Sequence, residues 1–246
     1  MISDDDRLAA DLAAEAGRRL LALRAAGGAA DELRRAGDRS SHEFLTAELA
    51  RHRPGDAVLS EEGADDLARL SAHRVWIVDP LDGTREFGEP GRSDWAVHVA
   101  LWERGGLTAG AVALPAQDKV LSTADPVKTP ASPPGTLRLL VSRTRPPEFM
   151  TRLARKLDAE LVPMGSAGAK AAAVICGDAE AYVHSGGQYE WDSAAPVAVA
   201  VASGLHASRI DGSKLSYNQA KPSLPDILIC QAALADPLLE AISSVR

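Results

Sequence analysis

Residues 75–84 read VWIVDPLDGT, and this stretch decides the fold. Its first four residues are apolar or aromatic, which predicts a buried strand. Pro80 has no N–H to donate to a neighbouring strand, so we expect the strand to end at Asp79 and the chain to turn there. Asp79 and Asp82 are then three residues apart in a tight turn, where both carboxylates can point at one spot.

Two carboxylates that lie so close repel each other unless a proton or a cation stands between them. Mg2+ is the natural occupant, because it is a hard cation that prefers oxygen ligands and keeps several waters. Gly83 and Thr84 follow with free backbone N–H groups, which can form a nest for a phosphate. A cation site beside an anion site is the arrangement of metal-assisted phosphoryl chemistry.

Composition indicates an ordinary globular protein. The chain has 246 residues, 46% hydrophobic and 25% charged, enough for one large domain or two small ones that share a core. A net charge of −7 argues against binding to nucleic-acid polymers. Cys176 and Cys230 both fall in apolar runs, as buried thiols of a reducing compartment do. The acidic N-terminus is no signal peptide and no run spans a membrane, so we expect a cytoplasmic protein.

Helix and strand patterns divide the chain into two halves. Ser3 and Asp6 fit a capping box for a helix that ends at Gly27, and a second helix is expected to begin near Ser40 after a charged loop. Strands at 95–102, 107–114 and 119–123 predict an antiparallel meander. Strands and helices alternate from residue 137 onward, which predicts an α/β arrangement.

The Pro-rich stretch 124–136 is the best linker in the chain. We therefore expect an N-terminal α+β metal-binding domain over 1–130 and a C-terminal α/β substrate-specificity domain over 131–246.

Three interpretations compete for DPLDGT at residues 79–84. It could be an acidic surface turn that caps a helix. The haloacid-dehalogenase phosphatases carry Asp-x-Asp-Gly-Thr at a strand end, but here two residues separate the aspartates and a proline follows the first. The stretch instead resembles the Asp-Pro-(Leu/Ile)-Asp-Gly-Thr signature of the inositol monophosphatase superfamily. That resemblance implies a layered α-β-α-β-α sandwich of the inositol monophosphatase and fructose-1,6-bisphosphatase type.

Two weaker motifs extend this resemblance. Glu61 and Glu62 end a short strand and resemble the superfamily's Glu-Glu motif, although a solvated acidic turn would look the same. Trp191 and Asp192 resemble its Trp-Asp-x-Ala motif, although an aspartate before small residues can also be a helix N-cap.

Carried over to this sequence, the resemblance implies a site for two or three Mg2+ ions, with inhibition by Li+. The implied metal ligands are Glu61, Asp79, the carbonyl of Leu81, Asp82 and Asp192. The implied catalytic residues, which activate and orient the attacking water, are Asp38, Glu61, Asp82 and Thr84. Gly83 and Thr84 would bind the phosphate, and Asp38 could alternatively be a helix N-cap. The loop before Asp38 departs from the family pattern.

The C-terminal half contains the residues that resemble the 3'(2'),5'-bisphosphate nucleotidase branch. Ser166 and Lys170 match its Gly-Ser-x-x-x-Lys, and Arg143 follows a strand end; with Asp192 these are the implied substrate contacts. A cation there could neutralise a second phosphate, although Lys170 could be a solvated helix residue and Arg143 a surface-loop residue.

The resemblance therefore implies a Mg2+-dependent phosphomonoesterase of sulfur assimilation. It would convert adenosine 3',5'-bisphosphate to AMP, with conversion of the 3'-phosphorylated sulfate donor to its 3'-dephosphorylated form left open. The alternatives are inositol monophosphatase or fructose-1,6-bisphosphatase activity, and a metal-binding regulator without catalysis. The expected partners are small phosphate esters and, as an open possibility, a second copy of the chain, with no membrane or nucleic-acid polymer.

Overall fold

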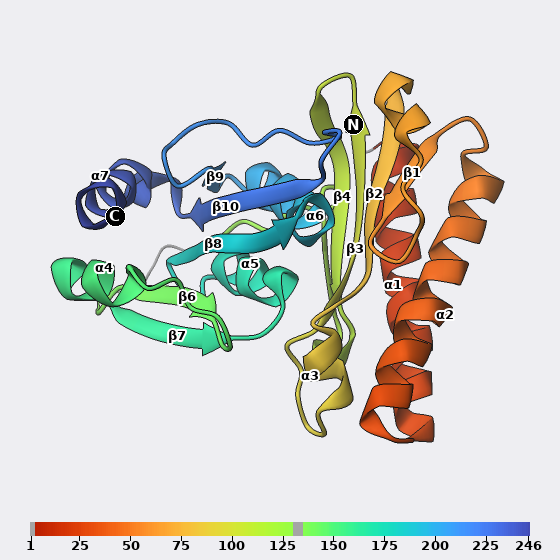
Figure 1. Ribbon diagram of the computed structural model, residues 1–246, viewed down its shortest axis with the longest axis horizontal. Helices are drawn as coiled ribbons and strands as arrows, with labels where there is room; N and C mark the ends of the chain where they lie inside the picture. Colours follow the sequence, from red (N-terminus) through yellow and green to blue (C-terminus); the bar gives the residue numbers. More distant parts are fainter. Residues whose placement is uncertain (1–2, 130–134) are drawn as a thin grey trace.

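The computed structural model describes residues 3–129 and 135–246. Figure 1 shows five alternating layers across the molecule, with a layer of helices on each outer side and a third layer of helices between the two sheets. This confirms the predicted α-β-α-β-α sandwich.

The first sheet has the strand order β1-β2-β3-β4-β5. Only β1 and β2 are parallel, and the rest is the predicted antiparallel meander. Helices α1 and α2 cover its outer face (Figure 1). The bounds are α1 Asp4–Ala26, α2 Ala30–His52, β1 Ala57–Ser60, β2 Arg74–Asp82, the short α3 Thr84–Gly88, β3 Ala96–Glu103, β4 Gly106–Leu114 and β5 Lys119–Ser122.

The second sheet has the order β7-β6-β8-β10-β9 and mixes parallel with antiparallel pairs. Helices α5 and α6 fill the space between the two sheets, and α4 and α7 cover the far face (Figure 1). The bounds are β6 Arg138–Ser142, α4 Met150–Leu157, β7 Glu160–Met164, α5 Ala167–Cys176, β8 Ala181–Tyr189, α6 Glu190–Ala202, β9 His206–Ser208, β10 Ser223–Cys230 and α7 Ala235–Val245.

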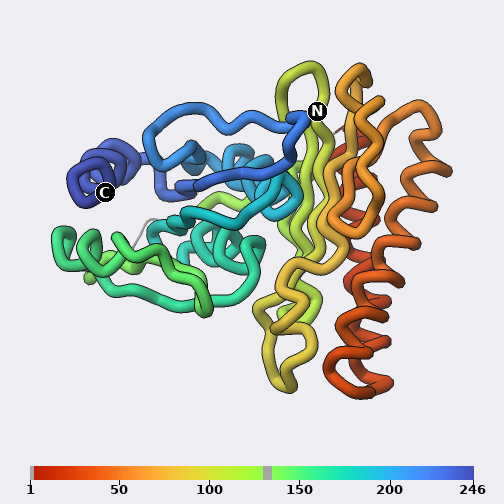
Figure 2. The backbone as a smooth tube through the Cα atoms, in the orientation of Figure 1, coloured from red at the N-terminus to blue at the C-terminus, as the bar shows by residue number. Residues whose placement is uncertain are grey.

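The predicted division into a metal-binding and a substrate-specificity domain stays a prediction. Its boundary at residues 130 and 131 lies outside the described residues. The strands of the first sheet all precede that point in the sequence and those of the second sheet all follow it. In Figure 2 the red-to-yellow-green and green-to-blue parts of the tube lie on different sides of the molecule. Within the described chain, no helix combines the length and apolar character needed to cross a membrane.

Helix α1 begins and ends as the sequence predicts. The Ser3 hydroxyl accepts a hydrogen bond from the Asp6 N–H while Asp6 accepts one from the Ser3 N–H, which is the capping box. The helix ends at Gly27, whose φ of 76° favours glycine.

Helix α2 corrects the prediction of a charged loop before residue 40. It begins at Ala30, so Asp38 lies inside the helix and is not its N-cap. The charged residues at 31 and 32 face solvent, whereas Gly37 is buried where a Cβ atom would lie 2.9 Å from Leu81 and from Phe87. The helix therefore approaches the end of β2 closely at this glycine.

Strand β2 also differs from the expectation that Pro80 ends it. The strand continues to Asp82, and its register with β3 shifts between Asp79 and Asp82. At such an irregularity a residue does not need to donate a backbone hydrogen bond to the neighbouring strand. Pro80, which has no N–H, can therefore lie within β2.

Side-chain alternation along β2 assigns its two faces. Trp76 and Val78 pack against the outer helices, while Val75 and Ile77 belong to the core that surrounds α5 and α6. By the same alternation Asp79 faces the middle of the sandwich, where the second half of the chain can reach it.

Helix α6 packs closely on β4 at Gly110. A Cβ atom there would lie 2.7 Å from the Ala198 Cβ atom and 3.3 Å from the Ala195 carbonyl oxygen. We expect Gly110→Ala to lower the free energy of unfolding by about 1–3 kcal/mol through overpacking, measured by urea denaturation. Gly106→Ala, in the same strand but with nothing within 4 Å of a new Cβ, is the control and should not be destabilised. Equal stability of the two variants would contradict this packing.

Candidate active site

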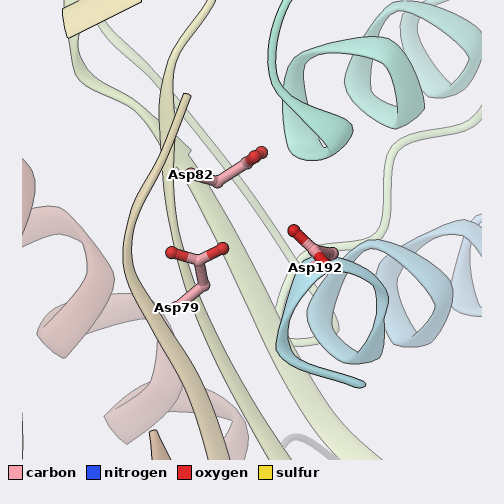
Figure 3. Close-up of side chains that lie close together, drawn as sticks. All are labelled: Asp79, Asp82 and Asp192. Carbon is pink, nitrogen blue, oxygen red and sulfur yellow. The ribbon is translucent and has the colours of Figure 1, made fainter. Parts of the chain in front are cut away.

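Three buried or half-buried carboxylates converge between the two sheets. One oxygen each of Asp79, Asp82 and Asp192 lies within 4.8 Å of the others (Figure 3). Asp79 and Asp82 come from the end of β2, and Asp192 comes from the first turn of α6. The cluster therefore exists only because the two halves of the chain pack together.

The Asp82 carboxylate is surrounded by donors from the start of α5. It accepts hydrogen bonds from the Ala167 N–H at 3.1 Å, the Gly168 N–H at 2.6 Å and the Ser166 hydroxyl. Burial opposes its charge, but His98, Lys170 and Ser166 outweigh that effect and hold the pKa of Asp82 below its usual range. Asp82 is thus an anion in the folded protein.

Asp79 has the opposite character. Its Oδ1 atom accepts a hydrogen bond from the Leu81 N–H at 3.1 Å, but its Oδ2 atom has no donor among the described residues. Burial, together with Glu61 and Asp82, raises the pKa of Asp79 well above its usual range. A buried oxygen without a donor beside other carboxylates is a position that a cation would satisfy.

Glu61 and Asp192 share this accumulation of negative charge. Glu61 is exposed as a residue, but the enclosure of its carboxyl group beside the cluster and the nearby Asp192 raise the pKa of Glu61 to about 7. Burial and Asp82 raise the pKa of the half-buried Asp192 to about 6. The donor set consists of oxygens only, which fits Mg2+ better than metals that prefer nitrogen or sulfur ligands.

Thr84 connects this cluster to α2. Its hydroxyl lies 2.9 Å from the Leu81 carbonyl oxygen and 3.3 Å from Asp38 Oδ1. Burial and the charge of Glu62 raise the pKa of Asp38 to about 6. Asp38 can therefore exchange a proton near neutral pH, one hydroxyl away from the end of β2.

A cleft of about 420 Å³ opens beside the carboxylates and is lined by four basic side chains. Two of them have partners within the protein. Arg143 pairs with Glu86 at 2.6 Å and with Glu89 at 3.0 Å. Lys170 is 4% exposed, and its ammonium group donates to the carbonyl oxygens of residues 164, 165 and 166. Burial lowers the pKa of Lys170 to about 8.

The other two basic residues of the cleft are Arg85 and Arg145, and both are exposed. Neither guanidinium group forms an ion pair with any residue in 3–129 or 135–246. The cleft therefore joins a cluster of carboxylates to positive charge that the protein itself does not neutralise.

Comparison with known proteins assigns this architecture. The model of the inositol monophosphatase family matches residues 7–244. The chain belongs to the inositol monophosphatase family.

Two relatives and one solved structure illustrate its place in the family. The chain is 56% identical to the 3'-phosphoadenosine 5'-phosphate phosphatase of Mycobacterium tuberculosis, with 93% of this chain and 90% of the relative covered. It is 53% identical to the protein of the same name from Mycobacterium leprae, with 98% and 94% covered. CysQ from Bacteroides thetaiotaomicron has a TM-score of 0.78 at 26% identity, with 93% of this chain and 97% of that chain covered.

Within this family member, most residues predicted for the site lie around one place. The structure brings Asp79, Asp82 and Asp192 together, with Glu61 close enough to raise the pKa of Asp79. Gly83, Thr84, Arg143, Ser166 and Lys170 line the adjoining cleft, and Asp38 contacts Thr84. Their roles in binding and catalysis stay predictions.

Two alternatives from the sequence receive an answer. Asp192 is not the N-cap of α6, because the helix begins at Glu190 and the Asp192 carboxylate accepts a hydrogen bond from the Tyr189 N–H at 2.6 Å. Lys170 is not a solvated helix residue, because its side chain is buried.

Sequence reasoning missed His98, Arg85 and Arg145, although Arg85 directly follows Thr84 in the sequence. His98 has no exposed surface and lies opposite Asp79 in the pairing of β3 with β2. Its signal was a lone histidine in an apolar strand, which gains meaning only when the strand register is known. Arg145 follows Arg143 by two residues, and its signal was a second arginine in the same strand-end loop.

Asp79→Asn tests the charge accumulation. The change removes a carboxylate from a repelling cluster, so without metal we expect a melting temperature equal to or above wild type at pH 8. We expect Mg2+ to raise the melting temperature of the wild type, and this rise should be lost in Asp79→Asn. Asp11→Asn, at an exposed position of α1, is the control and should keep that rise. A full Mg2+ effect in Asp79→Asn would contradict a metal site at this cluster.

The raised pKa values also predict how stability depends on pH in the metal-free protein. Asp192 holds its proton in the folded state up to about pH 6, whereas the unfolded chain releases it near 3.8. Glu61 acts in the same direction but contributes less, because solvent screens its exposed side chain. Stability from Asp192 is therefore complete at low pH and is lost as the pH rises through its folded-state pKa. We expect the melting temperature with chelator to fall as the pH rises from 3.8 to about 6, and saturating Mg2+ to remove the fall. A metal-free protein that becomes more stable across this window would oppose the assignment.

Proposed function

We propose that this protein is a Mg2+-dependent phosphomonoesterase that removes the 3'-phosphate of adenosine 3',5'-bisphosphate to give AMP. The observation that carries the proposal is the cleft in which acidic residues adjoin Arg85 and Arg145, two arginines without acidic partners in the described part of the chain. Mycobacterial relatives named 3'-phosphoadenosine 5'-phosphate phosphatase support the same substrate.

The unpaired arginines favour a substrate with two anionic groups. A monoester phosphate can be neutralised at the carboxylate end of the cleft by bound cations. Arg85 directly follows Thr84 at the carboxylate end of the cleft. A second phosphate would then find Arg145, because the guanidinium group of Arg143 is already paired with Glu86 and Glu89. Lys170 lines the same cleft, but a contact with substrate would compete with its three carbonyl partners.

The carboxylates of Glu61, Asp79, Asp82 and Asp192, with the Leu81 carbonyl oxygen, are the groups that would hold Mg2+. When bound, Mg2+ lowers the pKa of a coordinated water and stabilises negative charge on the leaving oxygen.

The remaining roles fall to the chain's own residues. Thr84 would orient the attacking water, and its hydroxyl connects that water to Asp38. As the water oxygen bonds to phosphorus and the bond to the ribose 3'-oxygen breaks, the water proton passes toward the Asp38 carboxylate. The leaving 3'-oxygen takes a proton from solvent, and the N–H groups of Gly83 and Thr84 bind the phosphate oxygens.

The proposal extends to related chemistry. The 3'-phosphorylated sulfate donor carries the same 3'-phosphate and a second anionic group, so we include it as a substrate and place the enzyme in sulfur assimilation. We also expect Li+ to inhibit, by occupying a Mg2+ position.

Arg145→Ala tests the second phosphate site. A charge-assisted contact with phosphate contributes roughly 1.5–3 kcal/mol. Because Arg145 is exposed, we expect the lower end, a loss of about tenfold in kcat/KM for adenosine 3',5'-bisphosphate. The loss should appear mainly in KM, since the contact exists both before and during the reaction. Hydrolysis of adenosine 3'-monophosphate should change little.

Arg155→Ala is the matched control, because it removes the same charge from an exposed position of α4 outside the cleft. Equal losses on both nucleotides would assign Arg145 to the fold and not to the second phosphate. Wild-type release of phosphate from inositol 1-phosphate or fructose 1,6-bisphosphate in preference to the nucleotide would overturn the substrate. No release from any ester with Mg2+ would favour a metal-binding regulator.

A further inference from the structure

His98 lies inside the candidate site, where it favours the anionic form of Asp82, but it has so far been given no part in metal binding. It lies on β3 directly across from Asp79, and its side chain has no exposed surface. The ring projects toward α5, where a Cβ atom on Gly168 would lie 2.1 Å from His98 Nε2. A glycine at that position of α5 therefore makes room for this imidazole.

The two ring nitrogens of His98 reach different halves of the molecule. Nδ1 lies 3.0 Å from the Trp191 carbonyl oxygen, and Nε2 lies 3.2 Å from Asp82 Oδ2. A carbonyl oxygen can only accept a hydrogen bond, so Nδ1 carries a proton and donates it to Trp191. Asp79 Oδ2 is 4.0 Å from the same nitrogen.

These contacts join the three segments that supply the carboxylate cluster. Trp191 directly precedes Asp192, so a hydrogen bond to its carbonyl oxygen fixes the first turn of α6. The other side of the ring contacts Asp82 at the end of β2, and the ring's own strand pairs with Asp79. A rigid planar ring thus spans the gap between the Asp82 carboxylate and the backbone carbonyl group next to Asp192.

We propose that His98 is a positioning residue that sets the distance between Asp82 and Asp192, and thereby determines the affinity of the carboxylate cluster for a divalent cation. The inference rests on the metal site of the proposed function. It does not depend on which phosphate ester the enzyme hydrolyses.

The test measures Mg2+ binding by calorimetry and by the Mg2+-dependent rise in melting temperature, without substrate. His98→Leu removes both polar contacts at similar size, and we expect the dissociation constant for Mg2+ to rise at least about tenfold. His98→Asn keeps an N–H near the position of Nδ1, so it should restore the Trp191 contact and recover most of the affinity. This recovery is not expected if the ring serves only to fill space.

Val99→Ala controls for a general loss of stability. Val99 lies next to His98 on β3 but faces the outer core, away from the cluster. It should lower the melting temperature of the metal-free protein while leaving Mg2+ affinity within about twofold of wild type. If Val99→Ala weakens Mg2+ binding as much as His98→Leu, or if His98→Leu binds Mg2+ like wild type, the proposal is wrong.

Gly168→Ala keeps the test informative where His98→Leu does not fold. A methyl group there would push against the imidazole without removing it, and we expect it to weaken Mg2+ binding in the same direction. Unchanged Mg2+ affinity in Gly168→Ala would count against the proposal. Because the binding measurement uses no ester, an error in the proposed substrate leaves its outcome unchanged, and phosphate release by wild type tests that substrate separately.

Discussion

The hydrogen bonds between Asp82 and the start of α5 are the constraint on which the site depends. Asp82 belongs to the first sheet, yet its carboxylate accepts from the N–H groups of Ala167 and Gly168 in the second half of the chain. A buried carboxylate without these donors would be costly, and the first N–H groups of α5 would lack acceptors. The Asp82 side chain therefore caps α5 and links the first sheet to that helix. It also places one oxygen close to Asp79 and Asp192.

Acidic and basic side chains occupy different parts of the site. Negative charge accumulates where β2 meets α6. The pKa values of Asp79, Glu61 and Asp192 are raised because, without a cation, their charged forms are unfavourable next to one another. Positive charge in the cleft is of two kinds. Arg143 and Lys170 are held by acidic or carbonyl groups of the protein, so they contribute to its architecture. Arg145 has no such partner among the described residues, which leaves its charge available to a ligand.

Local patterns predicted much of this fold. The capping box of α1, the antiparallel meander and the apolar run of β2 depend on neighbours within a few residues, and each is in place. The start of α2 was missed because the exposed face of a helix carries the same polar residues as a loop. Only packing against Leu81 and Phe87 shows why Gly37 belongs inside that helix. The continuation of β2 past Pro80 was missed because it depends on a register shift with β3.

Site residues that belong to one continuous sequence motif were predicted, whereas residues that only tertiary packing brings to the site were missed. DPLDGT contains two of the three clustered aspartates, so residue order alone brings them together. His98 lies in the site because β3 pairs with β2. Arg143 is not available to a ligand because it is paired with Glu86, which lies 57 residues earlier in the sequence. Neither fact is encoded in a local pattern, because both depend on which distant segments pack together.

The placement of Arg145 has a consequence for how such enzymes diversify. Arg145 lies in a loop after β6, while the carboxylates come from β2 and α6, so the two sets of groups are carried by different stretches of the chain. An exposed loop tolerates insertion and exchange far better than a buried strand end. Exchange of the loop after β6 would therefore change the charge that lines the cleft while leaving the carboxylates of β2 and α6 in place.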